Sequence, residues 1–187
     1  MGINLPRKLF HLFFSLFLYF LFVKLDKKSF QIFLVGSFIF LTIWEILRLK
    51  KPSLLPFKNL WKKLLKEREF NEFTDAFFYL LGIIVATLIA PYSFVGSLIL
   101  ILGISDPLAE FIGKLLKGKR LFREKTLSGS LAFFFSSLLI IFWQFKGLSI
   151  ILIIFAVNLT LIELFTKRDN FWIPFSGALF TRFFLTS

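Results

Sequence analysis

The 187-residue sequence has no cysteine, a single histidine and only 11 acidic residues against 23 Lys and Arg. Because cysteine is absent, disulfide bonds play no part in the fold. No linker, internal repeat or low-complexity tract divides the chain, which predicts one domain over residues 1–187. The net charge of +12 does not indicate a nucleic-acid partner, because the cations are gathered into the loops between apolar runs.

Hydrophobic residues make up 57% of the chain, 30 residues are Phe, and the mean hydropathy is +0.81. This composition is typical of an integral membrane protein. We predict an all-α, polytopic membrane helix bundle of about seven transmembrane helices, with six as the nearest alternative. The apolar runs lie at about 9–23, 30–47, 74–90, 93–113, 128–145, 148–166 and 171–185.

The basic loops predict the orientation in the membrane. With seven helices, the N-terminus and the second, fourth and sixth connections share one side and carry most of the Lys and Arg. Because short loops rich in Lys and Arg stay in the cytoplasm, we expect a cytoplasmic N-terminus and an external C-terminus. The expected location is an inner or plasma membrane, with membrane lipids as partners and a homodimer as an open option.

The longest connection, about residues 49–70, predicts an amphipathic helix on the cytoplasmic membrane surface. Leu60, Trp61, Leu64 and Leu65 recur at helical spacing against a basic face. Each cation near the surface would favour anionic lipid by about 1 kcal/mol. A solvated loop anchored by Trp61 is the alternative.

Two acids lie in the apolar segment 103–113. Asp106 and Glu110 are one helical turn apart and so share a helix face. An intramembrane carboxylate costs at least about 2.5–3.5 kcal/mol, so we expect Asp106 to face a polar cavity and to be functional. The loop that follows carries Lys114, Lys117, Lys119, Arg120, Arg123 and Lys125. An acid followed by such cations suits a metal-bound phosphate at a membrane surface.

Polar residues also mark the ends of the first two apolar runs. His11 follows Arg7 by four positions and shares its helix face, beside Lys8, so both a structural and a functional role are open. Glu45 and Arg48 are three positions apart and are expected to pair, which lowers the cost of burying the carboxylate.

Three further apolar runs have acids at their ends. Thr74 and Asp75 precede the third run and are expected to cap its helix. Asp169 and Asn170 enter the last run after Glu163 and form a second acidic centre, as helix caps or as oxygen ligands for a hard cation. The residues expected at the cytoplasmic ends of their helices are Arg7, His11, Glu45, Arg48, Glu72, Glu163 and Asp169. We therefore expect one site that is open to the cytosol and bordered by lipid.

Four pieces of sequence, in order, carry a family resemblance: RKLFH at 7–11, EILR at 45–48, SDPLAEFIGKLLKGKRLFREKTLSGSLAF at 105–133 and DNFWIP at 169–174. The chain resembles the CTP-dependent polyprenol kinase family, which includes dolichol, phytol and farnesol kinases and CTP-dependent diacylglycerol kinases. The third piece is the most specific, and its matching residues are Asp106, Ala109, Gly113, Lys114, Gly118, Lys119, Lys125, Thr126, Gly129 and Ser130.

The resemblance implies transfer of the γ-phosphoryl group of CTP to the hydroxyl of a long-chain lipid alcohol, with Mg²⁺ as cofactor. It implies that Asp106, with Asp169 or Asn170, binds the metal, and that Asp169, Glu163 or His11 acts as the base, with Asp169 favoured. The residues expected at the nucleotide are Arg7, Lys8, Lys114, Gly118, Lys119, Lys125, Thr126, Ser128, Gly129 and Ser130. Residues expected to support the site are Glu45, Arg48, Glu72 and Gly113.

Two other function classes remain. The central pattern also resembles that of phosphatidate cytidylyltransferases, but their Ser-Pro-x-Lys-Thr-x-Glu-Gly and C-terminal Gly-His-Gly-Gly patterns are absent, which favours a kinase. A transporter or scaffold would distribute polar residues through the bilayer, whereas the middles of these apolar runs are almost wholly Phe, Leu and Ile.

Overall fold

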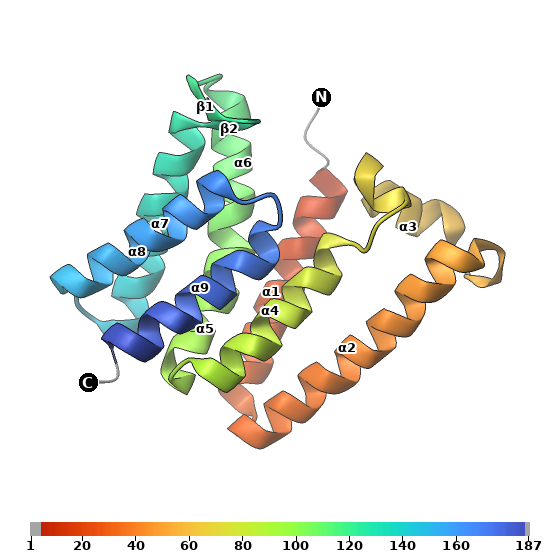
Figure 1. The fold of residues 1–187 in the computed structure, drawn as a ribbon, viewed down its shortest axis with the longest axis horizontal. Coiled ribbons are helices and arrows are strands. Elements are labelled where there is room, and N and C mark those ends of the chain that lie inside the picture. The colour runs from red at the N-terminus through yellow and green to blue at the C-terminus, as the bar shows by residue number, and fades with distance from the viewer. Residues whose placement is uncertain (1–4, 186–187) are drawn as a thin grey trace.

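The computed structural model describes residues 5–185, except for the side chains of Lys58 and Leu60, and most of this chain is helical (Figure 1). The elements, in chain order, are α1 (Leu5–Lys24), α2 (Lys27–Lys50), η1 (Pro52–Leu54), α3 (Lys58–Leu64), η2 (Glu67–Phe70), α4 (Asp75–Ile89), α5 (Tyr92–Leu100), η3 (Ile101–Ser105), α6 (Asp106–Leu115), β1 (Arg120–Phe122), β2 (Lys125–Thr126), α7 (Leu127–Phe145), α8 (Ile150–Phe165) and α9 (Asp169–Phe184).

Each predicted apolar run coincides with a helix, and the fourth run forms one rod from α5, the π-helical turn η3 and α6. Among the described residues, four helices are long and apolar enough to cross a membrane: α1, α2, the α5–α6 rod and α7. Helix α4 has 15 residues and α8 and α9 have 16 each, so they span only about 22–24 Å of a hydrocarbon core about 30 Å thick. The predicted all-α class is confirmed. The long apolar helices are compatible with an integral membrane protein.

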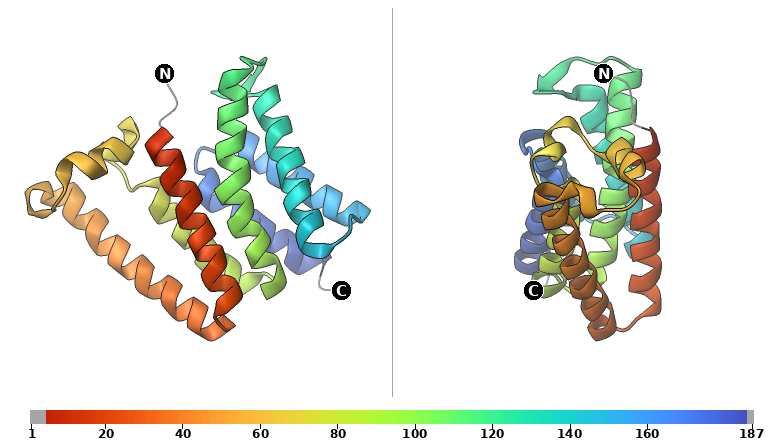
Figure 2. Two further views of the ribbon diagram at one scale, coloured as in Figure 1. Left: turned by 180° about the vertical axis from the view of Figure 1, so that it is seen from behind. Right: turned by 90° about the vertical axis from the view of Figure 1, so that its right-hand side faces the viewer.

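The helices pack in two layers. Helix α1, the α5–α6 rod and α7 lie side by side on one face, and α4, α9 and α8 lie behind them (Figure 2). Helix α2 packs against α4 at one edge. Fully buried side chains between the layers include Tyr79, Ile83, Leu98, Phe155 and Ile173. The core is therefore apolar, and the buried charges lie towards one end of the bundle.

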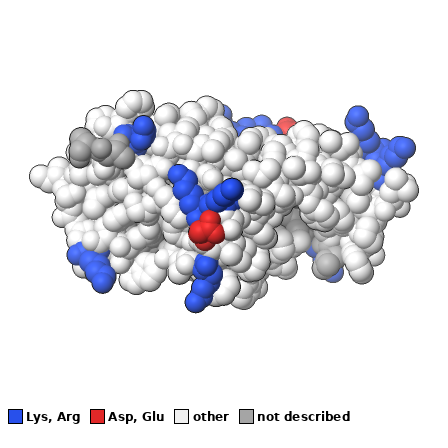
Figure 3. All heavy atoms as spheres, turned by 90° about the horizontal axis from the view of Figure 1, so that it is seen from below, with Lys and Arg blue, Asp and Glu red and all other residues white. Residues whose placement is uncertain are grey.

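The outer surface of the bundle is rich in large apolar side chains. Phe13 and Phe40 on the two N-terminal helices are 66% and 69% exposed, and Leu139 on α7 is 68% exposed. Exposed apolar residues on so many helix faces suit contact with lipid. The end of the bundle opposite the hairpin shows mostly uncharged atoms, with an acidic group beside Lys and Arg near the centre of this view and further charged side chains towards its edges (Figure 3).

The connection between α2 and α4 departs from the prediction of a surface helix over 49–70. Only α3 is α-helical there, with seven residues, and it lies between the 3₁₀ turns η1 and η2. Pro52 begins η1 and Pro56 precedes α3, and proline cannot donate the backbone hydrogen bonds that a longer helix would need. The predicted amphipathic pattern is present within α3, since Trp61 and Leu64 are partly buried while Lys62 is exposed.

The basic loop between α6 and α7 contains a short hairpin that the sequence analysis did not predict. Arg120 pairs with Thr126 and Phe122 with Lys125 in antiparallel register. Arg123 adopts a positive φ of 52° at the turn. This hairpin delivers Lys125 to the ends of α8 and α9.

Candidate functional site

Carboxylates from two helices bind Lys125, and a third acts on it electrostatically. Its ammonium group donates hydrogen bonds to Glu163 Oε1 at the end of α8 and, at 3.0 Å, to Asp169 Oδ2 at the start of α9. Asp106, at the start of α6, also interacts electrostatically with Lys125 and with Asp169. We call Asp106, Glu163, Asp169 and Lys125 the carboxylate cluster. Its members come from positions 106 to 169, yet they form one charged site.

The pKa of Lys125 reflects these neighbours. Burial alone would lower it, but the carboxylates of Asp169, Asp106 and Glu163 act in the opposite direction and outweigh burial. The pKa therefore lies above its ordinary value, and the ammonium stays charged at any physiological pH. The carboxylates around this ammonium group therefore favour a positive charge at this position.

A second group of charges joins α1 to α6. Lys8 lies 2.5 Å from Glu110 Oε2 and 3.8 Å from Asp106 Oδ2. Lys114 donates to the other oxygen of Glu110 at 2.7 Å. The predicted nucleotide residues Lys8 and Lys114 thus bind the two oxygens of Glu110, and Lys8 also reaches Asp106.

The start of α7 packs against α6 beside the carboxylate cluster. Thr126 caps α7 by accepting a hydrogen bond from Gly129 N–H, and Ser130 Oγ lies 3.5 Å from Glu163. A Cβ on Gly129 would lie 2.8 Å from a backbone oxygen of α6, and a Cβ on Gly113 would lie 2.6 Å from Thr126 Oγ1. Both glycines therefore allow a close helix contact that places the α7 N-terminus at the site.

Two other residues of the matched motif lie in the same loop. Gly118 lies directly against the Ser128 side chain, so a larger residue there would displace it. Lys119 is exposed, and its carbonyl accepts the Leu127 N–H at 2.9 Å. Lys119 makes no ion pair with the carboxylate cluster, so it lies on the rim of the site.

The π-helical turn explains the environment of His11. Within η3, Asp106 N–H bonds to Ile101 O, so the next bond in this pattern would run from residue 107 to Leu102 O. Residue 107 is proline and has no N–H, which leaves the Leu102 carbonyl free. His11 Nε2 lies 2.9 Å from that carbonyl and must be the donor, because a carbonyl only accepts. Nε2 is therefore not free to accept a proton.

A second cluster surrounds Asp75 at the start of α4. Its carboxylate, 5% exposed, lies 2.8 Å from Arg7, 2.9 Å from Lys66 and 2.6 Å from Arg68. We call these four residues the Asp75 hub. Lys66 also interacts electrostatically with Asp106 and Asp169, so the hub adjoins the carboxylate cluster. Arg7, which is predicted at the nucleotide, is part of this hub.

The predicted pair of Glu45 and Arg48 is confirmed and is buried. The two side chains are 2.7 Å apart, and Arg48 also donates to the carbonyls of Glu69 and Glu72 at 2.5 and 2.7 Å. The pair thus fixes the backbone before α4 to helix α2. Glu72 itself bonds to Arg168 at 2.5 Å, which joins the connections before α4 and α9.

The predicted capping roles at the start of α4 need correction. Thr74 occupies the N-cap position, but its side chain makes no cap bond. Instead, Thr74 Oγ1 and N–H donate to the two carboxylate oxygens of Glu45, at 3.0 and 3.1 Å. Asp75 binds three cations rather than serving only as a first-turn acid. Both side chains find stronger partners among buried and cationic groups than the helix end offers.

The residues present fit the Mg²⁺ that the resemblance implies. Magnesium prefers oxygen ligands and commonly uses one or two protein carboxylates with phosphates and water. Asp106 and Asp169 act on one another electrostatically, and Asn170, adjacent to Asp169, is buried with no hydrogen-bond partner for its Oδ1 in the part of the chain that the structure describes. Across residues 5–185, no three His, Asp or Glu side chains form a group spaced for a metal held by protein alone.

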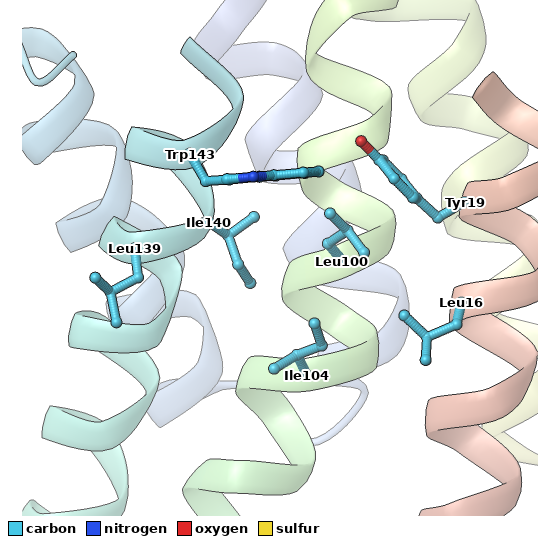
Figure 4. A pocket seen from close by; sticks show the side chains of 7 residues that line it. All are labelled: Leu16, Tyr19, Leu100, Ile104, Leu139, Ile140 and Trp143. Carbon is cyan, nitrogen blue, oxygen red and sulfur yellow. The ribbon is translucent and has the colours of Figure 1, made fainter. Parts of the chain in front are cut away.

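An apolar groove of about 370 Å³ lies elsewhere, between α1, the α5–α6 rod and α7 (Figure 4). Tyr19 and Trp143 reach towards each other across it, with ring centroids 6.1 Å apart, above Leu100 and Ile104. Ile104 and Asp106 are two positions apart, so their side chains leave the helix on nearly opposite sides. The groove suits a lipid chain, and no member of the carboxylate cluster is among its lining residues.

Comparison with known proteins adds one relative and no activity. No family model matches the chain, and no solved structure matches it. The chain is 29% identical over 193 residues to a Rickettsia prowazekii (strain Madrid E) protein described as uncharacterized protein RP860. The match covers 95% of this chain and 93% of the relative, so the similarity extends over the whole fold.

Proposed function

We propose that this protein is a CTP-dependent lipid kinase that transfers the γ-phosphoryl group of CTP to the hydroxyl of a membrane alcohol. The observation that carries the proposal is the carboxylate cluster, in which Lys125 bonds to Glu163 and Asp169 beside the α7 N-terminus and Asp106 adds a third negative charge that acts on Lys125 electrostatically. The family motif supplies three of these four residues, and Glu163 adds the last. Acceptors of this class are polyprenol, dolichol, phytol, farnesol and diacylglycerol.

In the proposed reaction, the alcohol oxygen attacks the γ-phosphorus and the bond from that phosphorus to the β,γ-bridging oxygen breaks. CDP leaves with the bonding electron pair, and the alcohol proton passes to a carboxylate. We assign that role to Asp169, the carboxylate that accepts a hydrogen bond from Lys125 at 3.0 Å in the carboxylate cluster. Transfer of this kind depends on positioning and on neutralising phosphate charge.

Protein residues supply most of the neutralisation. Lys125, Lys8 and Lys114 bring positive charge to phosphate oxygens, and the hydroxyl groups of Thr126 and Ser130 lie beside them. The α7 N-terminus adds backbone N–H groups, which favour bound anions. Mg²⁺ held by Asp106 and Asn170 would neutralise further phosphate charge.

The proposed membrane arrangement has seven spanning helices, with the N-terminus and the site in the cytoplasm and the C-terminus outside. The three short helices support it, because α4 and α9 begin at charged residues and α8 ends two residues after Glu163. Their shortness would leave a polar recess below the inner membrane surface, where a nucleotide and a lipid hydroxyl meet. The excess of Lys and Arg in the loops at this end supports the orientation.

The deciding experiment supplies purified protein in lipid vesicles with Mg²⁺ and CTP labelled at either the α- or the γ-phosphate. Movement of γ-label to an isoprenoid alcohol or diacylglycerol is expected. Movement of α-label to phosphatidate would instead identify a cytidylyltransferase, and no transfer of either label would exclude both. Asp106→Asn should abolish transfer, whereas Asp26→Asn, which replaces the exposed N-cap of α2 by another good cap, should not.

A further inference from the structure

Lys66 belongs to the Asp75 hub, which adjoins the carboxylate cluster, since Asn170, next to Asp169, donates to the Asp75 carbonyl at 3.4 Å. The Lys66 ammonium group is 2.9 Å from Asp75 Oδ2 and also interacts electrostatically with Asp106 and Asp169. Neither the resemblance nor the sequence analysis assigns it a role. It reaches the site from the connection between α2 and α4, far along the chain from the basic loop at 114–125.

A buried glutamate fixes the backbone at Lys66. Glu69, 2% exposed, accepts the Lys66 N–H at 2.6 Å with one oxygen and the Asp75 N–H at 2.7 Å with the other. One carboxylate thus holds both members of the Lys66–Asp75 pair by their main chains. Arg48 in turn donates to the Glu69 carbonyl, which ties the segment to α2. Such anchoring exceeds what a solvated surface loop requires.

The Lys66 side chain can leave Asp75 at low cost. It is 41% exposed, whereas the Asp75 side chain is 5% exposed. Asp75 would keep Arg7 on one oxygen and Arg68 on the other, at 2.8 and 2.6 Å. Departure of Lys66 therefore leaves no buried carboxylate without a partner. Lys66 is the member of the Asp75 hub best placed to exchange its partner for a ligand.

We propose that Lys66 binds the phosphates of the nucleoside triphosphate, and that Asp75 is a positioning residue which holds the ammonium group in place until the ligand arrives. This inference rests on the proposed function and adds to it a second basic segment, the connection between α2 and α4 that carries Lys66. The ligand class is a magnesium-bound polyphosphate, recognised by charge rather than by its base. When the ligand binds, Lys66 leaves the Asp75 carboxylate, which keeps two other cations, and pairs with a phosphate oxygen that needs a cation.

The test measures equilibrium binding of Mg·CTP and of magnesium tripolyphosphate to the full-length protein in detergent. Lys66→Met is expected to weaken both by about 10- to 100-fold, the range for one hydrogen bond to a charged group. Lys66→Arg should retain most of the affinity because it keeps the charge. The matched control is Lys62→Met, at an exposed lysine of the same connection, which should bind as the wild type does.

Further readouts separate ligand binding from a structural role. Lys66→Met should raise the KM for CTP without changing the KM for the alcohol, and should reduce the dependence of binding on ionic strength. Asp75→Asn removes the carboxylate that holds the ammonium group in place, so it should weaken tripolyphosphate binding, but by less than Lys66→Met does, because the Lys66 cation remains. Lys66→Gln, which keeps a polar side chain of similar length without the charge, should weaken binding as Lys66→Met does and keeps the proposal testable if Lys66→Met folds poorly.

Two results would overturn the inference, and they are distinguishable. If the wild type binds Mg·CTP and Lys66→Met binds it equally well, the role of Lys66 is wrong and the proposed function stands. If the wild type binds neither CTP nor tripolyphosphate, the proposed function fails and the inference fails with it.

Discussion

Replacing Lys125 by methionine is expected to destabilise the protein while leaving the side-chain volume almost unchanged. The substitution removes the ammonium group that bonds Glu163 and Asp169 and leaves their carboxylates facing one another and Asp106. Removing one partner of a buried ion pair costs about 3–5 kcal/mol, and the 29% exposure of the Lys125 side chain places this case near about 2–3 kcal/mol.

Thermal unfolding in detergent, without nucleotide, measures this cost. For a chain of this size, about 2–3 kcal/mol corresponds to a fall in Tm of about 4–12 °C. Lys119→Met is the matched control, because Lys119 is exposed and makes no ion pair with the carboxylate cluster. It should unfold within about 0.5 kcal/mol of the wild type.

The double variant Lys125→Met with Glu163→Gln tests the cause of the loss. The Glu163→Gln change removes one of the two carboxylates that lose their bond to Lys125, and only Asp169 is then left without it, so the double variant should recover part of the lost stability. Since the Lys125 pKa is raised in the folded protein, its contribution is complete below about pH 10.4, the ordinary lysine pKa, and is lost only as the pH rises through the higher folded value. The reasoning is refuted if Lys125→Met matches the wild type in Tm, or if the difference between them changes from pH 7 to 9.

Two further predictions concern packing at the site. His11→Ala should lower the free energy of unfolding by about 1–3 kcal/mol, because it leaves the Leu102 carbonyl without a donor. The loss should be smaller in a Pro107→Ala background, which restores a backbone N–H nearby. Equal losses in both backgrounds would contradict this account of the π turn. Gly129→Ala should destabilise the protein by about 1–3 kcal/mol, because the new Cβ would lie 2.8 Å from a backbone oxygen. Gly36→Ala, where a Cβ would have nothing within 4 Å, should stabilise the protein by about 0.5–1 kcal/mol. Similar Tm shifts for the two variants would be inconsistent with this packing.

The helices were the most predictable part of the structure. Each apolar run became a helix because sustained apolar composition dominates local preference, and the Glu45–Arg48 pair followed from helical spacing alone. The grouping of the charged residues also followed from their positions at run ends. Their pairing did not, because it depends on contacts between distant segments, such as the 68 residues that separate Arg7 from Asp75.

The errors have local causes. A Thr-Asp pair before an apolar run looks the same whether it caps a helix or binds distant charges, so the partners of Thr74 and Asp75 could not be read from sequence. The break in the surface helix had a visible signal in Pro52 and Pro56. Pro107, directly after Asp106, was likewise a readable sign of an irregular turn.

The central claim is that Asp106 and Asp169, from α6 and α9, act together in one phosphoryl-transfer site. The most direct measurement is kcat/KM for γ-phosphoryl transfer from CTP in Asp106→Asn, Asp169→Asn and the double variant, with Asp26→Asn as control. Residues that act as a unit are not additive, so each single variant should lose most activity and the double should lose little more. Full activity in Asp106→Asn, or losses that multiply in the double variant, would contradict the account.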